Sequence, residues 1–263
     1  VVRFIKSRFY TKDYQPISVE IAEELLHRLE SGLVVKRTLG SCGGKSVRLY
    51  RKDEGGRHVD DMGNILSLGE FVNCFEGGHF VFQRRLEQSE FTKQFNRSSV
   101  NTFRVMTLRL PENESEIVVL KSILRMGVGD VIVDNEASGG ISVGVLSDGT
   151  FSSYATDGNG QKVAFHPVTK IRFEGQKCLY IDDIYKLVIH LAKMVPHLRL
   201  LSWDVALDEN NKPFCIEVNT SSVSIGFLQT FNGSLFGEYS KLVRDYCRSH
   251  RHNDQFKYLR TFY

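Results

Sequence analysis

The chain has 263 residues, enough for one large domain or two small ones that share a cleft. Its 41% hydrophobic and 25% charged residues are ordinary for a globular protein with a sizeable core. A net charge of +3 is too small to indicate nucleic-acid binding and is compatible with a small anionic ligand. The five cysteines are scattered and include no CxxC pair, which indicates free thiols, and no apolar run approaches the roughly 18 residues that span a bilayer. We therefore expect a cytoplasmic protein, and a homo-oligomer stays open.

The first half of the chain predicts a mixture of helices and short strands. Residues 1–5 form a β-like run with no methionine before it, so we expect an upstream segment to be missing or processed away. Ser18 is a candidate N-cap for a helix whose apolar residues recur on one face. The elements predicted after this run are a helix at 16–30, strands at 33–36 and 46–50, a polar loop at 51–64, a short helix at 66–74 and a strand at 80–83.

The second half is richer in strands that follow one another through short turns. Its predicted elements are strands at 102–110 and 116–124, irregular strand and loop at 128–149, a helix at 182–194, strands at 200–207 and 213–218, and a helix at 234–248. Consecutive strands joined by turns form antiparallel hairpins. The pattern therefore favours an α+β fold over a doubly wound parallel sheet.

Two carboxylates and an amide stand at the end of the last predicted hairpin. Asp204 lies on one strand, and Glu217 and Asn219 lie on the next. Counting from the turn brings the two acids together, and residues two apart on a strand share a face. Such oxygen ligands suit Mg²⁺, which keeps several waters and substrate phosphates. A solvated hairpin face is the alternative; the apolar neighbours of each acid argue against it, because buried unpaired carboxylates are costly.

A glycine-rich segment with lysines at both ends joins the strands at 33–36 and 46–50. It does not match the P-loop motif, because Gly40 leaves three residues instead of four before Gly44-Lys45, and a strand follows instead of a helix. The backbone N–H groups of a glycine hairpin can still bind phosphates, with Lys36 as a point charge. An ordinary hairpin turn is the alternative.

Three strand cations and one glycine pair are further candidates. Arg104, Lys121 and Arg125 lie on two consecutive predicted strands, where they could neutralise a transferring phosphoryl group or simply line a solvated rim. The pair Gly139-Gly140 allows either a close approach of a ligand or a bulge. His166 is expected in a loop or in the core. No HExxH spacing or GxSxG elbow occurs, so hydrolase chemistry has little support.

Taken in order, these features resemble the ATP-grasp superfamily, and more narrowly the sugar-transfer-associated ATP-grasp proteins. The resemblance covers roughly residues 30–225, and it is carried by the joint order of motifs that are each weak alone. The motifs are Val35-Lys36 through Gly43-Gly44, Asn101-Thr102-Phe103-Arg104, Leu124-Arg125-Met126-Gly127, Asp134-Asn135 with Gly139-Gly140-Ile141, His166-Pro167, Trp203-Asp204 and Ile216-Glu217-Val218-Asn219.

The resemblance implies an ATP-grasp fold in which two α+β subdomains clasp ATP, with an N-terminal subdomain that is short or missing here. The expected division is 1–82, with the helix and the glycine hairpin, and 83–263, with the metal site. The implied nucleotide contacts are Lys36, Gly43, Gly44 and Lys45 at the phosphates, Gln83, Arg84, Arg85 and Leu86 at the adenine, and Glu87 at the ribose. The implied Mg²⁺ ligands are Asp204, Glu217 and Asn219.

The resemblance also implies a reaction. The implied catalytic residues are Arg104 and Arg125, and the implied substrate contacts are Asn101, Lys121, Asp134, Asn135, Gly139 and Gly140. The expected enzyme is an ATP- and Mg²⁺-dependent ligase that activates a small-molecule carboxylate as an acyl phosphate for attack by an amine, in glycan or natural-product biosynthesis. Two alternatives stay open: a small-molecule kinase of the same fold, and a nucleotide-binding module without catalysis.

Overall fold

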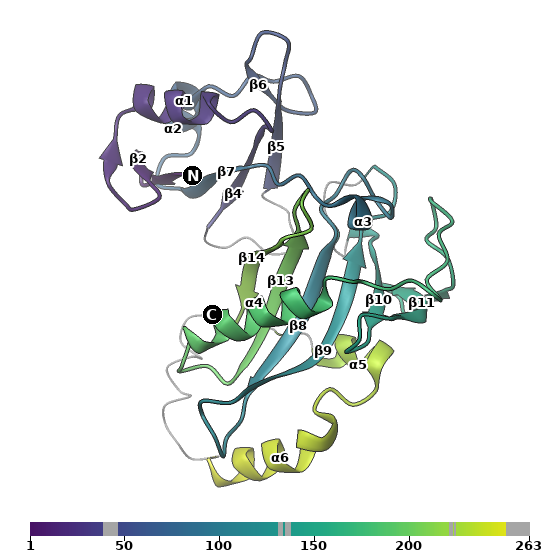
Figure 1. Ribbon diagram of the computed structural model, residues 1–263. Helices are drawn as coiled ribbons and strands as arrows, with labels where there is room; N and C mark the ends of the chain where they lie inside the picture. Colours follow the sequence, from purple (N-terminus) through teal and green to yellow (C-terminus); the bar gives the residue numbers. More distant parts are fainter. Residues whose placement is uncertain (39–46, 131–133, 135–137, 221–222, 224, 251–263) are drawn as a thin grey trace.

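The computed structural model describes residues 1–38, 47–130, 134, 138–220, 223 and 225–250. In these ranges the chain forms two antiparallel sheets with helices packed against them, so the predicted α+β class is confirmed. Figure 1 shows the first sheet, in purple and blue, above the second, whose strands run from blue through green. No helix of the described part combines the length and the apolar composition that crossing a membrane requires.

The first sheet has seven strands in the order β3-β2-β1-β7-β4-β5-β6. They are β1 (Val2–Ile5), β2 (Arg8–Thr11), β3 (Pro16–Ile17), β4 (Leu33–Arg37), β5 (Val47–Lys52), β6 (His58–Val59) and β7 (His79–Arg84). Two helices, α1 (Val19–His27) and α2 (Leu68–Cys74), each begin after a serine whose hydroxyl accepts a backbone N–H. Leu26, Phe71 and Phe82 belong to the core between these helices and the sheet.

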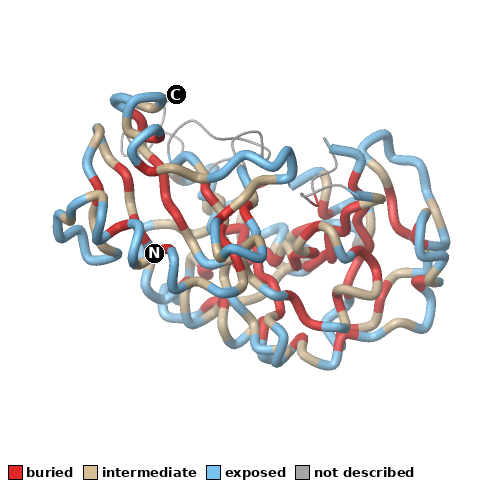
Figure 2. The backbone as a smooth tube through the Cα atoms, turned by 90° about the horizontal axis from the view of Figure 1, so that it is seen from above, coloured by how far each residue is buried: buried red, intermediate tan, exposed pale blue. Residues whose placement is uncertain are grey.

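The second sheet also has seven strands, in the order β12-β11-β10-β9-β8-β13-β14. They are β8 (Thr102–Arg109), β9 (Ile117–Met126), β10 (Ile141–Val145), β11 (Phe151–Asp157), β12 (Lys162–Val163), β13 (Leu200–Leu207) and β14 (Pro213–Asn219). Helix α4 (Ile181–Lys193) crosses one face (Figure 1), where its Ile184 and Val188 share a core with Phe103 and Trp203. Figure 2 shows that the buried stretches of the chain lie in its interior and the exposed ones at its outside.

The face of the second sheet opposite α4 is polar at one end and apolar at the other. Arg104 and Asp204 directly follow the core residues Phe103 and Trp203, so alternation turns them to this opposite face. The apolar end is a small separate core that contains Met106, Val223, Leu228 and Leu235. The last helical elements are α5 (Ile225–Asn232), which packs on β9 and β10, η2 (Gly237–Tyr239) and α6 (Ser240–Ser249).

A buried amide network fixes the chain segment that joins the two sheets, which contains α3 (Glu90–Lys93). Asn101 Nδ2 donates to Gln88 Oε1 at 3.0 Å and to the backbone carbonyls of Thr92 and Asn96 at 2.8 and 2.9 Å. Its Oδ1 accepts the N–H of Gly127 at 3.3 Å. Because these groups are buried and satisfied, they hold the segment rigidly. Gln88 also forms an isolated backbone bridge to Asp208, the residue that follows β13.

His166 is completely buried near this network. Its Nδ1 accepts the backbone N–H of Thr169 at 3.3 Å, so Nε2, which lies 3.0 Å from the carbonyl oxygen of Gly127, carries the ring proton. Burial lowers the pKa of His166, and the imidazole is therefore neutral. The prediction of a loop or core histidine is confirmed.

Most predicted elements are present, with ends shifted by a few residues. The predicted helix at 16–30 starts too early: Pro16 pairs with Tyr10 as part of β3, and the extended backbone of Ser18 delays the helix to Val19. The predicted C-terminal helix also starts too early, because α6 begins at Ser240. The polar loop at 51–64 contains β6, and the irregular segment at 128–149 contains β10. The division between residues 82 and 83 falls within β7 and stays a prediction.

Candidate active site

Three charged side chains form one row across the polar face of the second sheet. Arg104 of β8 lies opposite Asp204 of β13, and Asp204 lies opposite Glu217 of β14. Residues directly opposite on adjacent strands share a face, with Cβ atoms about 4.5–5.5 Å apart. The predicted proximity of Asp204 and Glu217 is confirmed by this register. A β-bulge follows the acidic pair, since the next partner of β13 is Cys215 and Ile216 is passed over.

Asp204 is held by two arginines. Arg104 binds both of its carboxylate oxygens, Nε to Oδ1 and Nη2 to Oδ2, each at 2.8 Å. Arg125 Nη1 donates to Oδ2 at 3.3 Å. Only 4% of Asp204 is exposed, and this burial alone would raise its pKa, but the two guanidinium groups hold the pKa of Asp204 below its ordinary value. Asp204 is therefore ionised and fixed in place.

Arg125 connects Asp204 to a second buried carboxylate. Its Nη2 donates to Asp134 Oδ1 at 3.0 Å. Asp134 Oδ2 accepts the backbone N–H of Thr102 at 3.1 Å and also the Thr102 hydroxyl. Burial raises the pKa of Asp134, and the ion pair with Arg125 opposes this shift. Both ion pairs of Arg125 are therefore buried, and its side chain is only 7% exposed. The side chain of Arg104 is 15% exposed and is the more accessible of the two arginines.

Glu217 stands at the accessible end of the row. Partial burial of its carboxylate, the charge of Asp204 and a hydrogen bond to Asp204 raise the pKa of Glu217. The charges of Lys36 and Arg104 act in the opposite direction and lower it. Lys36 lies on β4 of the first sheet, so both sheets contribute charged groups to this region.

Buried polar atoms without a partner gather on the same face. Ser202 Oγ and Asn219 Nδ2 have no hydrogen-bond partner in the described structure, although the two residues lie opposite each other on β13 and β14. Ser142 Oγ, opposite Arg125 on β10, is in the same situation. An unsatisfied buried polar group costs about 1–3 kcal/mol. Three of them on one face indicate that water or a polar ligand completes it.

The acidic end of the row fits a divalent cation. Asp204 and Glu217 lie directly opposite each other, and the charge of Asp204 raises the pKa of Glu217. A divalent cation bound between them gains two carboxylate ligands and offsets this like-charge repulsion. Asn219 lies two residues beyond Glu217, and its amide can turn to present its oxygen. Among the described residues no group of three or more His, Cys, Asp or Glu could hold a metal ion. A set of two carboxylates and one amide suits Mg²⁺, which takes its remaining ligands from water and phosphates; this ligand set stays a prediction.

Several predicted substrate contacts lie away from the row. Lys121 is four residues before Arg125 on β9, about 13 Å along the strand, and lines a separate pocket with Asp148 and Tyr185. Asn101 is buried, and its amide is engaged in the network described above. Gly139 lies in a turn before β10 with a φ of +86°, the conformation that favours glycine. Gly43, Gly44, Lys45 and Asn135 lie outside the described residues.

The predicted adenine-binding segment connects the two sheets. Gln83 and Arg84 end β7, and Arg85 N donates to the carbonyl oxygen of Gly32 at 3.0 Å. Leu86 is half-buried and Glu87 is exposed. The segment therefore runs from the first sheet to the second, and its contacts with a nucleotide stay a prediction.

Sequence reasoning missed the polar side chains that surround the row. Thr102 precedes Arg104 by two residues and Ser202 precedes Asp204 by two, so strand alternation was a signal that could have found both. Ser142 offered no such signal. It reaches the site only through the pairing of β10 with β9, which joins residues distant in sequence.

Comparisons with known proteins agree with this architecture. The family model of the sugar-transfer associated ATP-grasp proteins matches residues 5–243. A comparison with curated proteins gives no match.

Solved structures resemble the chain over part of their length. An L-amino acid ligase from Bacillus licheniformis is 14% identical, with a TM-score of 0.44, over 92% of this chain and 42% of that one. N5-carboxyaminoimidazole synthetase from Staphylococcus aureus complexed with ADP is 13% identical, with a TM-score of 0.43, over 80% and 40%. The ATP-grasp ligase PsnB complexed with minimal precursor is 11% identical, with a TM-score of 0.43, over 87% and 51%. The chain spans about half or less of these proteins.

Proposed function

The chain belongs to the sugar-transfer associated ATP-grasp family, and we propose that it binds ATP with Mg²⁺ and uses it to activate a small-molecule carboxylate for attack by an amine. The observation that carries the proposal is the row of Arg104, Asp204 and Glu217, with Lys36 of the other sheet close enough to shift the pKa of Glu217. Cations and acids that converge from two sheets are what a metal-bound polyphosphate requires.

Bound Mg²⁺·ATP supplies a transferable phosphoryl group whose negative charge is partly neutralised by the cation. Glu217 and Asn219, with Asp204 behind them, hold the cation. Lys36 binds phosphate oxygens from the side of the first sheet. Arg104 keeps its Nη1 without a partner in the described part of the chain, so this group can donate to the γ-phosphate while Nε and Nη2 hold Asp204.

Arg125 has a positioning role in this proposal. It links Asp204 to Asp134, and both carboxylates are buried. The link keeps Asp204 and Arg104 in one geometry before the substrates arrive, and such preorganisation is a large part of catalysis in phosphoryl transfer. No protein nucleophile is needed, because the substrate carboxylate attacks the γ-phosphorus and ADP leaves.

The first experiment is a thermal unfolding measurement with Mg²⁺·ATP. A ligand at one hundred times its dissociation constant stabilises the folded state by about 2.7 kcal/mol, and we expect a corresponding rise in melting temperature. Lys36→Gln should lose most of the rise. Arg48→Gln is the matched control, because Arg48 lies on the opposite face of the first sheet and should leave the rise unchanged. A wild-type chain that shows no rise would refute the proposal at its first step.

A second experiment identifies the reaction. A panel of small carboxylic acids is incubated with ATP, Mg²⁺ and hydroxylamine, whose nitrogen displaces phosphate from an acyl phosphate. A hydroxamate together with ADP supports the ligase. ADP with a phosphorylated hydroxyl product and no hydroxamate indicates a kinase, and binding without ADP formation across the panel indicates a nucleotide-binding module. Mass spectrometry of the products names the carboxylate that is consumed.

A further inference from the structure

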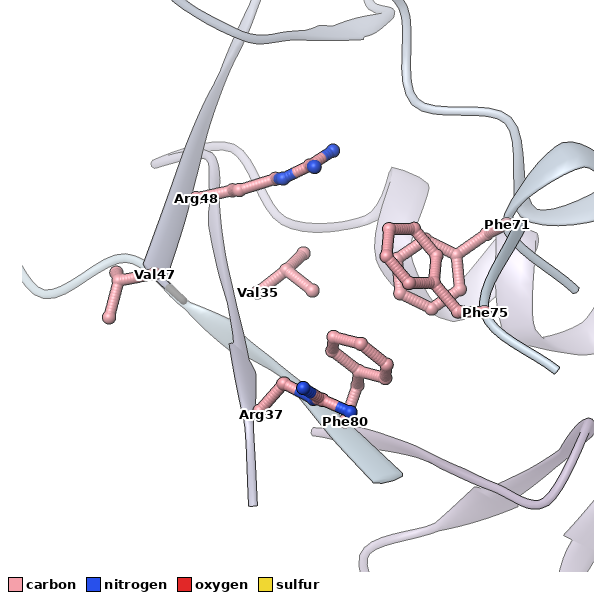
Figure 3. A pocket seen from close by; sticks show the side chains of 7 residues that line it. All are labelled: Val35, Arg37, Val47, Arg48, Phe71, Phe75 and Phe80. Atoms are coloured by element: carbon pink, nitrogen blue, oxygen red, sulfur yellow. The ribbon is translucent and has the colours of Figure 1, made fainter. Parts of the chain in front are cut away.

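A pocket of about 410 Å³ opens on the helix-covered face of the first sheet. Figure 3 shows its side chains, which come from β4, β5, β7 and the end of α2. The lining residues are Val35, Arg37, Val47, Arg48, Phe71, Phe75 and Phe80. Its volume lies within the range of about 300–1,000 Å³ that is usual for small-molecule sites.

The pocket combines an aromatic wall with two guanidinium groups. Arg37 lies over the ring of Phe80, 5.7 Å from its centroid, and Arg48 lies over the ring of Phe75 at 5.5 Å. A cation over an aromatic face stacks through the flat side of the guanidinium, which leaves N–H groups at its edge to bind a planar anion. None of the lining residues is acidic. The pocket is therefore apolar inside and positive at two points of its wall.

Among the described residues Arg48 takes part in no ion pair, whereas the arginines that follow it, Arg51 and Arg57, pair with Asp61 and Asp53. Asp60 is near enough to feel its charge, but the Asp60 carboxylate already accepts the backbone N–H groups of Met62 and Asn64 within its own loop, at 3.0 and 2.8 Å. Arg48 is also an exposed residue, so an incoming anion can reach its guanidinium without any displacement of the core.

This pocket is separate from the candidate active site. Val35 and Arg37 flank Lys36 on β4, and successive side chains of a strand point to opposite faces. Lys36 faces the acidic pair of the second sheet, so Val35 and Arg37 face away from it. The register agrees, because Arg48 lies opposite Val35 and Phe80 lies opposite Arg37 on the neighbouring strands. The aromatic rings and both guanidinium groups therefore lie on the face away from Lys36, and Val47, which pairs with Lys36, is the one lining residue on the Lys36 face.

We propose that this pocket is a binding site for a small amphipathic organic anion, with its flat apolar body against Phe75 and Phe80 and its anionic group at Arg48, where the positive charge of Arg37 lies in the same wall. The aromatic walls select the apolar body, because they bury it without requiring hydrogen bonds. The guanidinium group of Arg48 selects a carboxylate or a phosphate over a neutral group. The site is independent of ATP binding and of the reaction proposed above.

The test is an isothermal titration of the wild-type chain with three probes of one shape. 1-Naphthoate and 1-naphthyl phosphate carry the two kinds of anion, and 1-naphthylmethanol is their neutral counterpart. We expect the anions to bind more tightly than the neutral probe, and their order shows whether the site prefers a carboxylate or a phosphate. Saturating Mg²⁺·ATP should leave the affinities unchanged. Equal binding of all three probes, or displacement by ATP, would overturn the proposal.

Variants place the binding in this pocket. Arg48→Gln should weaken the anionic probes by about tenfold, the effect of one charge-assisted contact, and leave the neutral probe unaffected. Arg51→Gln is the control: Arg51 lies on the same strand, is similarly exposed, and points to the other face. Phe75→Leu keeps an apolar side chain and should weaken all three probes. Unchanged affinity in Arg48→Gln, or an equal loss in Arg51→Gln, contradicts the proposal.

Discussion

The acidic pair allows a prediction in which only one of two isosteric variants loses stability, whereas both lose ligand binding. Asp204→Asn and Glu217→Gln each remove one negative charge from side chains that lie opposite each other. Asp204 is buried and binds two arginines, whereas Glu217 is exposed and faces a like charge. The environment therefore decides the sign of each change in the free energy of unfolding.

Asp204→Asn should destabilise the chain. Removing one partner of a buried ion pair costs about 3–5 kcal/mol, and the retained amide oxygen argues for the lower end of this range. About 3 kcal/mol lowers the melting temperature of a domain of this size by roughly 6–12 °C. Glu217→Gln removes a like-charge contact between neighbouring strands, which is unfavourable by about 0.2–1 kcal/mol. It should leave the melting temperature unchanged or raise it by a few degrees.

Mg²⁺·ATP should stabilise neither variant as it does the wild type, because each lacks one of the two carboxylates proposed to hold the cation. The assay is differential scanning fluorimetry at neutral pH, with and without Mg²⁺·ATP, and with ATP and EDTA as the metal-free condition. An Asp204→Asn variant with the melting temperature of the wild type would contradict the predicted role of the buried ion pair. A Glu217→Gln variant that keeps the full rise in melting temperature with Mg²⁺·ATP would contradict the proposed cation site.

Three further predictions concern residues around the site. Because the folded-state pKa of His166 lies below its ordinary value of 6.5, its contribution to stability is full above pH 6.5 and is lost as the pH falls toward and through that lowered pKa. Urea unfolding of His166→Gln should show less of this pH dependence than the wild type, the remainder coming from sites such as His58. Ser202→Ala removes an unpartnered hydroxyl, so the free energy of unfolding should change by less than about 1 kcal/mol. In the wild type Ser202 can accept a hydrogen bond from the Asn219 nitrogen when the Asn219 oxygen binds the cation. Without this hydroxyl, half-saturation of the site should need several times more Mg²⁺ in a titration. Asn101→Ala breaks a buried network and should lower the free energy of unfolding by about 3 kcal/mol or more, as measured by chemical denaturation. At temperatures where the variant is folded, its affinity for ATP should equal that of the wild type.

The proximity of Asp204 and Glu217 could be predicted because a short turn joins their strands. Counting from the turn, where Leu207 pairs with Pro213, places Asp204 opposite Ile216, and the bulge that passes over Ile216 moves Glu217 into the paired position. The closeness of the two acids therefore follows from the hairpin, whereas their direct pairing depends on the bulge. The position of Arg104 could not be obtained this way. It lies 100 residues before Asp204, and only the pairing of β8 with β13 brings the two together. The order of the motifs in the sequence suggested that Arg104 and Asp204 share a site. Their bidentate ion pair, however, depends on the order of the strands in the sheet, which places β8 next to β13.

Elements that lack a local signature were missed for the same reason. Helix α5 follows β14 closely and is short, and its fixed position depends on the small core around Met106 and Leu228, which other elements supply. Strand β11 carries Tyr154 and Thr156 among small polar residues, and its pairing with β10 stabilises it more than its own composition does. In both segments tertiary contacts outweigh the local sequence preference.

The two candidate sites show how one strand can serve two binding faces. Lys36 of β4 faces the acids of the second sheet, and its neighbours Val35 and Arg37 face the aromatic pocket. A shift of β4 by one residue would exchange these roles and would bury Lys36 in the core of the first sheet, where a lone ammonium group is costly. The same hydrophobic pattern that fixes the register of β4 through Leu33 and Val35 therefore also keeps the cation on the side where a polyphosphate can be bound.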